Sequence, residues 1–186
     1  MEITKTFYAS ERETWRAWLK EHYKSEKEIW LVYYRKQAGK PRISYNDAVE
    51  EALCFGWIDS TVKAIDADRI AQKFSPRRAG SAYSQPNKER LRRLIRRGKV
   101  IKGIAASVGD ILADEFAFPA DILIELKANK RAWDNFRGYS GSYQRIRVAF
   151  IDTARRRPGE YEKRLHHFIR MTERNKQYGY GIETYL

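Results

Sequence analysis

The sequence predicts an α+β protein, with an N-terminal unit of helices around a small antiparallel sheet and a C-terminal helical bundle or hairpin. Two observations lead to this prediction: runs of strand type occur only in the first half of the chain, and after residue 118 the apolar residues recur only at helical spacing. The 186 residues suffice for one sizeable core or two small ones. We therefore expect an α+β unit at residues 1–113 and a helical region at residues 114–186, or one compact unit overall.

The chain is expected to open with a helix and an interior strand. Ser10 and Glu13 have the spacing of a capping box, and Trp15 and Trp18 follow on one helix face, so both tryptophans should face the core. The run IWLVYY at residues 29–34 is too short for a helix and is apolar on both alternating faces. This pattern is typical of a strand in the interior of a sheet.

A second helix and a hairpin are expected next. Ser44 and Asp47 form another capping box, and Gly56 stands where the end of a helix favours a residue that adopts positive φ. The runs STVKAI and RIAQKFS then flank residues 66–68, which predicts a β-hairpin. The strands of this hairpin should pair with the first strand to complete the small antiparallel sheet.

Helices account for the rest of the predicted structure. Pro86 favours a helix through Arg97 that Gly98 ends, with its apolar residues inside and its basic residues outside. The stretch 110–118 indicates a boundary, after which apolar faces at helical spacing continue as far as Ile169. The tail after this point is expected to be mobile unless its tyrosines pack against the rest of the chain.

Positive charge is concentrated in one segment. The formal net charge is +13, and between Ser75 and Lys102 ten Lys or Arg residues accompany a single acid, Glu89. Such a surface attracts polyanions, whether nucleic acid, an acidic lipid surface or an acidic protein. The alternative is an ordinary solvated helix face. The predicted basic helix contains Lys88, Arg90, Arg92, Arg93, Arg96 and Arg97.

Several kinds of chemistry are not indicated by the sequence. No apolar run is long enough to cross a bilayer, and the N-terminus has no export-signal pattern, so we expect a cytoplasmic protein. One cysteine and three histidines without ligand spacing give no reason to expect a metal or another cofactor. Cys54, in the last turn of a predicted helix, is expected to be a buried packing thiol rather than a nucleophile.

Two motif blocks carry a family resemblance. They are ALCFGWIDS at residues 52–60 and PRR-x-x-S-x-Y-S-x-x-N at residues 76–87, preceded by WRAWL and EIWLVYYRK. Together they resemble the bacterial YdeI/OmpD-associated family, also called bacteriocin-protection proteins, over nearly the whole chain. The resemblance implies a role in tolerance of bacteriocins or cationic antimicrobial peptides and association with an outer-membrane porin, and it supplies no catalytic residues. Tyr83 stands where the family usually shows tryptophan.

The two blocks also supply the candidate site residues. Asp59 could pair with Arg77 or Arg78, and a structural ion pair is favoured over a general base because no histidine, second acid or metal accompanies Asp59. The turn that follows combines guanidinium groups, hydroxyls and an aromatic ring before a helix N-terminus, which suits anion binding; the same residue types also cap hairpins and helices. The candidate ligand-binding residues are Trp57, Asp59, Arg77, Arg78, Ser81, Tyr83, Ser84 and Asn87, and no catalytic residue is assigned.

Three functions remain open on the sequence alone. The leading hypothesis is a binding protein for an anionic partner, with the role in peptide tolerance that the resemblance implies. An enzyme acting on an anionic small molecule would use Asp59 as a base and Arg77 and Arg78 as clamps, in a pocket that a sequence cannot show. A protein interaction module would dock a partner or a second copy through the C-terminal helices. The sequence determines neither whether the chain is an enzyme nor its oligomeric state.

Overall fold

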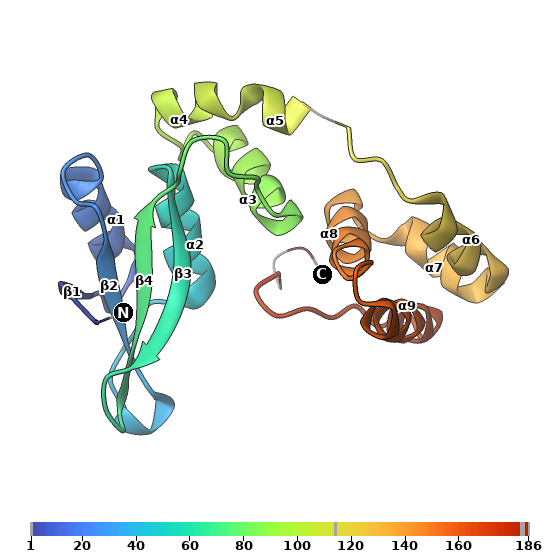
Figure 1. Cartoon of the computed structure of the whole chain (residues 1–186), viewed down its shortest axis with the longest axis horizontal. Helices are drawn as coiled ribbons and strands as arrows, with labels where there is room; N and C mark the ends of the chain where they lie inside the picture. Colours follow the sequence, from blue (N-terminus) through green and yellow to red (C-terminus); the bar gives the residue numbers. More distant parts are fainter. Residues whose placement is uncertain (1, 114, 183–184, 186) are drawn as a thin grey trace. The chain divides into compact units, whose positions relative to one another are not determined.

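The computed structural model describes residues 2–113, 115–182 and 185 (Figure 1). The chain divides into two compact units, one made of Met1–Tyr83 with Arg90–Ile111 and the other of Ser84–Glu89 with Leu112–Leu186. The strands of the described residues all lie in the first unit, and the second unit is built of helices. The α+β class predicted from the sequence is therefore confirmed.

The first unit is built on a four-stranded sheet in the order β1, β2, β4, β3. The strands are β1 (Thr6–Tyr8), β2 (Ile29–Tyr34), β3 (Trp57–Ala64) and β4 (Arg69–Pro76). β2 lies between β1 and β4, and five of its six residues are buried, as its apolar sequence predicts. The predicted hairpin of β3 and β4 is also confirmed, with Asp59 paired to Phe74 in the antiparallel register.

The structure adds an edge strand that the sequence did not indicate. β1 pairs with β2 in parallel, with Phe7 opposite Leu31, whereas β4 is antiparallel to both of its neighbours, β2 and β3. Three residues are too few to show an alternation of apolar and polar side chains, so no sequence pattern marks this strand. The sheet is therefore antiparallel over three strands and mixed as a whole.

Helices accompany the sheet in the first unit. They are α1 (Arg12–His22), the 3-10 turn η1 (Lys36–Ala38), α2 (Tyr45–Cys54), α4 (Lys102–Ser107) and α5 (Gly109–Ala113). The next helix after the hairpin, α3 (Gln85–Arg96), is shared, because the division between the two units falls inside it. Ser44 caps α2 as predicted, because its Oγ accepts a hydrogen bond from the backbone N–H of Asp47 at 3.1 Å. The capping box predicted before α1 is wrong: Glu11 is the N-cap residue, and no side chain caps this helix. α4 and α5 are too short for their spacing to have revealed them.

Aromatic residues dominate the core of the first unit. Trp15 and Trp18 on α1 stack with their ring centroids 5.2 Å apart, and Trp15 also packs 5.3 Å from Phe74 of β4. The indole N–H of Trp57 donates to the backbone carbonyl of Tyr23 at 3.1 Å, so this buried ring keeps its polar group paired. Because Trp57 is 1% exposed, its place is in the core and not on a surface that a ligand would meet.

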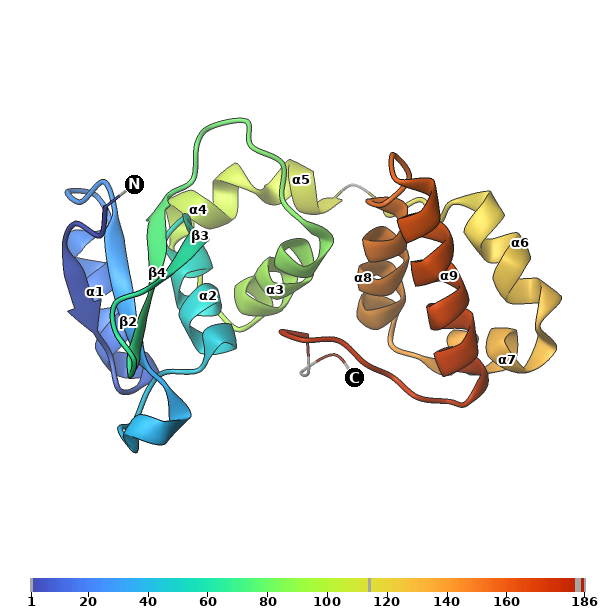
Figure 2. The same cartoon turned by 60° about the horizontal axis from the view of Figure 1, so that its bottom comes forward.

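The second unit is helical, as predicted. Its helices are α6 (Ala120–Ala128), α7 (Lys130–Gly138), α8 (Gly141–Asp152) and α9 (Pro158–Glu173). α8 and α9 lie side by side (Figure 2). Phe136, Tyr143, Ile146 and Phe168 belong to the hydrophobic core that these helices enclose. Proline begins α9 at Pro158, where the missing N–H costs the helix nothing.

The described part of the C-terminal tail packs against the second unit. The hydroxyl of Tyr143 accepts a hydrogen bond from the backbone N–H of Tyr178 at 3.0 Å and donates to its carbonyl at 3.3 Å. Ile182 is buried in the same core. Tyr178 of the tail packs against this core and Tyr185 belongs to it, which is the condition stated above for an ordered tail.

Neither a membrane-spanning helix nor a cluster of metal-ligating side chains is present among the described residues. None of the helices in this part of the chain has the length and apolar character needed to cross a bilayer. Nor do three or more His, Cys, Asp or Glu side chains within residues 2–113, 115–182 and 185 come together as a metal site.

Candidate functional site

Arg77 closes the turn that links β4 to α3. Its guanidinium lies 3.7 Å from the ring centroid of Tyr83, and one of its terminal nitrogens donates to the carbonyls of Ser81 (3.1 Å) and Ala82 (2.9 Å). Stacking and hydrogen bonding to the loop's own backbone thus occupy much of this side chain. Arg77 shapes the loop, which is a different role from the anion clamp that the sequence suggested.

Arg78, the second arginine of the turn, is exposed and remains available. Its carbonyl accepts a hydrogen bond from the Ser81 hydroxyl at 2.8 Å, which fixes the backbone of the turn. Among the described residues its guanidinium has no carboxylate partner. The turn therefore presents one cation, Arg78, on a loop that Arg77 holds in shape.

Asp59 does not pair with either arginine, so the predicted ion pair is wrong. Its Oδ2 accepts hydrogen bonds from Gln72 Nε2 at 2.8 Å and from the Tyr45 hydroxyl at 3.3 Å. The register places Asp59 opposite Phe74, three residues before Arg77 along β4. The Arg77 guanidinium turns away from this strand pair, because it stacks on Tyr83 and donates to the carbonyls of the turn.

Burial makes the carboxyl group of Asp59 a weaker acid than an exposed aspartate, and its two hydrogen-bonding neighbours are not suited to acid–base catalysis. Burial raises the pKa of Asp59, while the hydrogen bond from Tyr45, the charge of Arg90 and the hydrogen bond from Gln72 oppose the rise. Its two hydrogen-bonding neighbours are a phenol and an amide, and neither makes an acid–base pair with a carboxylate at neutral pH. This geometry supports a structural carboxylate and not a catalytic one.

Two arginines of α3 point inward, contrary to the prediction that the basic residues of this helix face solvent. Arg90 is 4% exposed and donates to the side-chain carbonyl of Asn46 at 3.1 Å. Arg93 forms an ion pair with Glu50 of α2. The prediction failed because the periodicity of α3 shows which residues share a face, but it does not show that α2 presents a carboxylate to that face. Arg90 and Arg93 therefore belong to the interior of the first unit.

A buried ionic network joins α1, α2 and α3 in the first unit, and the sequence analysis missed it. Arg12 contacts Glu51 at 2.5 Å and Glu50 at 3.1 Å, Arg16 contacts Glu51 at 2.5 Å, and Arg93 contacts Glu50. Both glutamates are almost fully buried, so each needs its arginines to compensate for lost hydration. The adjacent acids within an otherwise apolar helix were the signal that could have indicated it.

Cys54 is the buried packing thiol that the sequence predicted. Its side chain is fully buried. Burial raises the pKa of Cys54 to about 11, Glu51 adds to the rise and Arg16 opposes it. The thiolate required of a nucleophile is therefore scarce at neutral pH.

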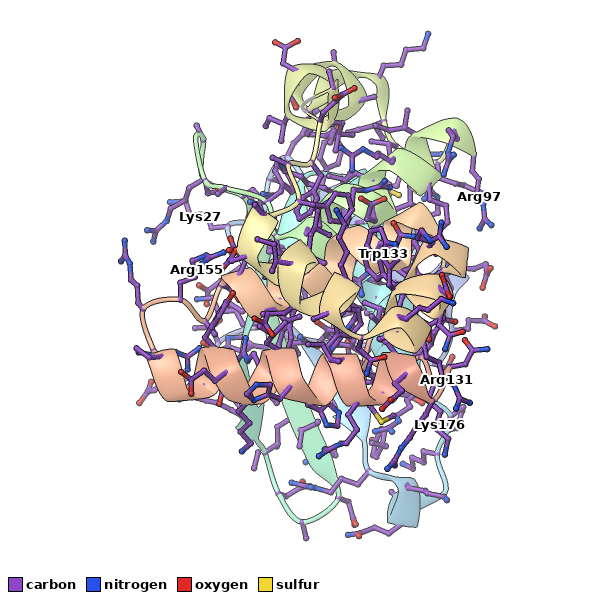
Figure 3. All side chains as sticks on the ribbon, turned by 90° about the vertical axis from the view of Figure 1, so that its right-hand side faces the viewer. Lys27, Arg97, Arg131, Trp133, Arg155 and Lys176 are labelled. Carbon is purple, nitrogen blue, oxygen red and sulfur yellow. The ribbon has the colours of Figure 1, made fainter. Side chains whose placement is uncertain are left out.

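The exposed positive charge gathers where α3 ends. Arg96, Arg97, Lys99 and Lys102 are exposed, and within the described residues none of these side chains pairs with a carboxylate; we call these four residues the basic end of α3. Gly98 stops the helix with a φ of +64° while the N–H of Lys99 donates to the Leu94 carbonyl at 3.0 Å. The side chain of Arg97 extends into solvent (Figure 3).

The other predicted site residues are distributed over both units. Ser81 and Tyr83 lie in the turn that Arg77 closes, as described above. Ser84 and Asn87 belong to the second unit, where Ser84 is exposed and Asn87 is buried. Of the predicted basic helix, Lys88 and Arg92 are half-buried. A role of these residues in binding stays a prediction.

Two family models match the chain. Residues 7–106, more than half of the chain, match a domain of unknown function (DUF8412), so the chain belongs to this family. Residues 115–175 match the family described as bacteriocin-protection, YdeI or OmpD-associated, which confirms the resemblance to this family for that part of the chain. The motif blocks at 52–60 and 76–87 lie in the first match, and the helices of the second unit lie in the second. Comparison with curated proteins and with solved structures gave no match.

Proposed function

We propose that the chain is a binding protein for a polyanionic partner, and that the basic end of α3 is its contact surface. One observation carries the proposal: four exposed cations follow one another within seven residues, and no described carboxylate neutralises them. Cations close to a helix C-terminus interact favourably with the helix dipole, and this interaction alone explains why one or two of the four cations are present. The further accumulation of like charges is repulsive, and binding of a polyanion would relieve this repulsion.

The chemistry of this surface favours recognition of charge over recognition of bases. The Tyr83 ring, which could have stacked on a base, is covered by Arg77 on one face. None of the four residues at the basic end of α3 is aromatic. Arg78 adds a further exposed cation in the first unit. Phosphate groups, in a nucleic acid backbone or an acidic lipid surface, are the partners that such a set of point charges suits best.

The cellular role we propose is the one that the second family description names. The match over residues 115–175 supports a part in protection against bacteriocins. Direct capture of cationic peptides is disfavoured, because the chain itself carries a net charge of +13. Protection through an anionic partner agrees with that charge. The cytoplasmic location expected from the sequence stays a prediction.

The enzyme hypothesis loses its main support in the geometry. It required Arg77 and Arg78 to act as clamps beside a basic Asp59, but Asp59 bonds to Tyr45 and Gln72, and Arg77 is folded onto its own loop. The hypothesis of an interaction module built on the C-terminal helices is neither helped nor harmed by these contacts, and it stays a prediction.

The proposal is tested by binding of the purified full-length chain to labelled double-stranded DNA, to labelled single-stranded RNA and to vesicles containing phosphatidylglycerol. The test variant is Arg96→Gln/Arg97→Gln. The control is Lys20→Gln/Lys27→Gln, which removes two exposed cations elsewhere in the first unit. Each phosphate contact is worth about fivefold in affinity near physiological salt, so losing two contacts should weaken DNA binding about 25-fold.

Each outcome of this experiment either supports or rejects the proposal. Tight binding of at least one probe by the wild type and the control, with weaker binding by Arg96→Gln/Arg97→Gln, supports the proposal and identifies the class of partner. Equal weakening in both double variants would show that binding follows overall charge and not this surface. No binding of any probe would reject the proposal.

A further inference from the structure

The second unit contains a buried arginine without a carboxylate partner. Arg147 of α8 is 6% exposed, and its Nε is buried with no hydrogen-bond acceptor among the described residues. No ion pair joins Arg147 to any carboxylate in the part of the chain that the structure describes. A buried guanidinium keeps its charge and carries five N–H donors, so an unpaired one is costly.

Aromatic rings surround Arg147 and stabilise its charge, but they do not meet all of its hydrogen-bonding capacity. The guanidinium carbon lies 3.9 Å from the ring centroid of Tyr178, 4.9 Å from that of Phe150 and 5.9 Å from that of Phe168. Cation–π contacts stabilise the charge through the faces of the guanidinium plane. The buried Nε–H lies in that plane, and it has no hydrogen-bond acceptor among the described residues.

Further positive groups lie near Arg147 in the second unit. Arg164 of α9 stacks 3.8 Å from the centroid of Phe150, and it forms an ion pair with Glu160 at 2.7 Å. Burial lowers the pKa of His167, and the charges of Arg170 and Arg147 lower it further. Arg164 and Arg170 thus add positive charge to this part of the second unit.

The C-terminal tail packs beside Arg147 and is held there by hydrogen bonds. Tyr178 is held through its backbone by the Tyr143 hydroxyl, as described above. At Gly179, φ is +150°, and an added Cβ would lie 2.4 Å from Ile182 Cδ1 and 3.6 Å from a terminal nitrogen of Arg147. The clash would be with Ile182 of the tail itself, whereas the distance to Arg147 is an ordinary contact, so glycine at this position fits the packing of the tail beside the arginine.

We propose that Arg147 anchors a site for a small oxyanion, a carboxylate or phosphate group, between α8 and the tail. A planar guanidinium edge binds two oxygens of such a group side by side, which supplies the acceptors that the N–H donors lack. Tyr178 and Phe150 flank the guanidinium, so they would also contact the part of the ligand next to its anionic group. This site lies within the second unit and does not depend on the basic end of α3.

Thermal unfolding of the full-length chain tests the site. Inorganic phosphate and sodium benzoate are titrated separately, with chloride added to keep the ionic strength constant. The variants are Arg147→Met and, as a matched control, Arg131→Met, which removes an exposed cation of α7 in the same unit (Figure 3). We expect the unfolding midpoint of the wild type and of Arg131→Met to rise with at least one anion and that of Arg147→Met not to respond. The responding anion identifies the ligand class.

Stability without added anion gives the second readout. Met fills similar space without a charge, so Arg147→Met should unfold at the same temperature as the wild type or higher. A lower midpoint would show that the arginine serves packing through its aromatic contacts, and it would overturn the proposal. Equal responses of all three proteins to both anions, or no response by the wild type, would also overturn it. The Arg96→Gln/Arg97→Gln variant should respond as the wild type does, so failure of one proposal is distinguishable from failure of the other.

Discussion

Gly56, in the centre of the first motif block, should be irreplaceable for two separate physical reasons. It follows α2 with a φ of +75°, and a Cβ at this position would lie 2.5 Å from Cδ1 and 3.3 Å from Cγ1 of Ile104 on α4. The left-handed backbone costs a residue with a side chain about 1–2 kcal/mol. Overpacking against Ile104 adds roughly 1–2 kcal/mol, because the contact is with the flexible end of its side chain. We therefore expect Gly56→Ala to lower the free energy of unfolding by about 2–4 kcal/mol.

Two controls separate the backbone contribution from the packing contribution in urea denaturation followed by circular dichroism. Gly80 has nearly the same conformation, with a φ of +73°, and an added Cβ would meet no atom within 4 Å, so Gly80→Ala should lose the backbone contribution alone. Ile104→Val deletes the atom nearest the new Cβ, so Gly56→Ala should be less destabilising in that background. Equal losses for Gly56→Ala and Gly80→Ala, or no rescue by Ile104→Val, would refute the packing argument.

Three further predictions concern buried groups of the first unit. Glu51→Gln should lower the free energy of unfolding by about 2–3 kcal/mol in urea, because it leaves Arg12 and Arg16 without their shared carboxylate. Cys54 should react with iodoacetamide at neutral pH far more slowly in the native than in the urea-unfolded chain, because burial raises its pKa to about 11. Burial also raises the pKa of Asp59, so ionisation of this carboxyl opposes folding, and stability should fall as the pH rises through that pKa. In urea titrations, Asp59→Asn should therefore be at least as stable as the wild type at neutral pH. The variant should lose this advantage below about pH 4, where the wild-type carboxyl is protonated as well.

Each of these predictions has a contradicting result. A Glu51→Gln variant as stable as the wild type would show that the arginines find other partners. Equal alkylation rates in the native and unfolded chains would place Cys54 at the surface. An Asp59→Asn variant that loses stability at neutral pH would show that the ionised carboxylate stabilises the fold.

Local sequence patterns predicted those elements whose neighbours lie close along the chain. The apolar run of β2, the hairpin of β3 and β4 and the helices of the second unit are determined by side-chain spacing and by turn residues. β1 could not be predicted, because three residues carry no period and its pairing partner β2 lies beyond a helix. The start of α1 was misjudged for a different reason: Ser10 and Glu13 have capping spacing, but the helix begins after Glu11.

The candidate site was harder to predict because long-range contacts decide which charges are free. The sequence counted Arg90 and Arg93 with the exposed cations, and only the packing of α2 against them shows that they are satisfied inside. Arg77 was expected to face a ligand, but the Tyr83 ring six residues later takes its guanidinium. Arg147 carried no motif at all, and its isolation from carboxylates appears only once α8, α9 and the tail are in place.

The most direct test of the central claim is the salt dependence of binding to double-stranded DNA, the polyanion whose charge density is best defined. The logarithm of the association constant is measured against the logarithm of salt concentration for the wild type, for Arg96→Gln/Arg97→Gln and for the Lys20→Gln/Lys27→Gln control. If the basic end of α3 contacts phosphates, losing Arg96 and Arg97 should reduce the magnitude of the slope by about 1.8, and the control should leave it unchanged. Identical slopes for all three proteins, or no measurable binding even at low salt, would contradict the account.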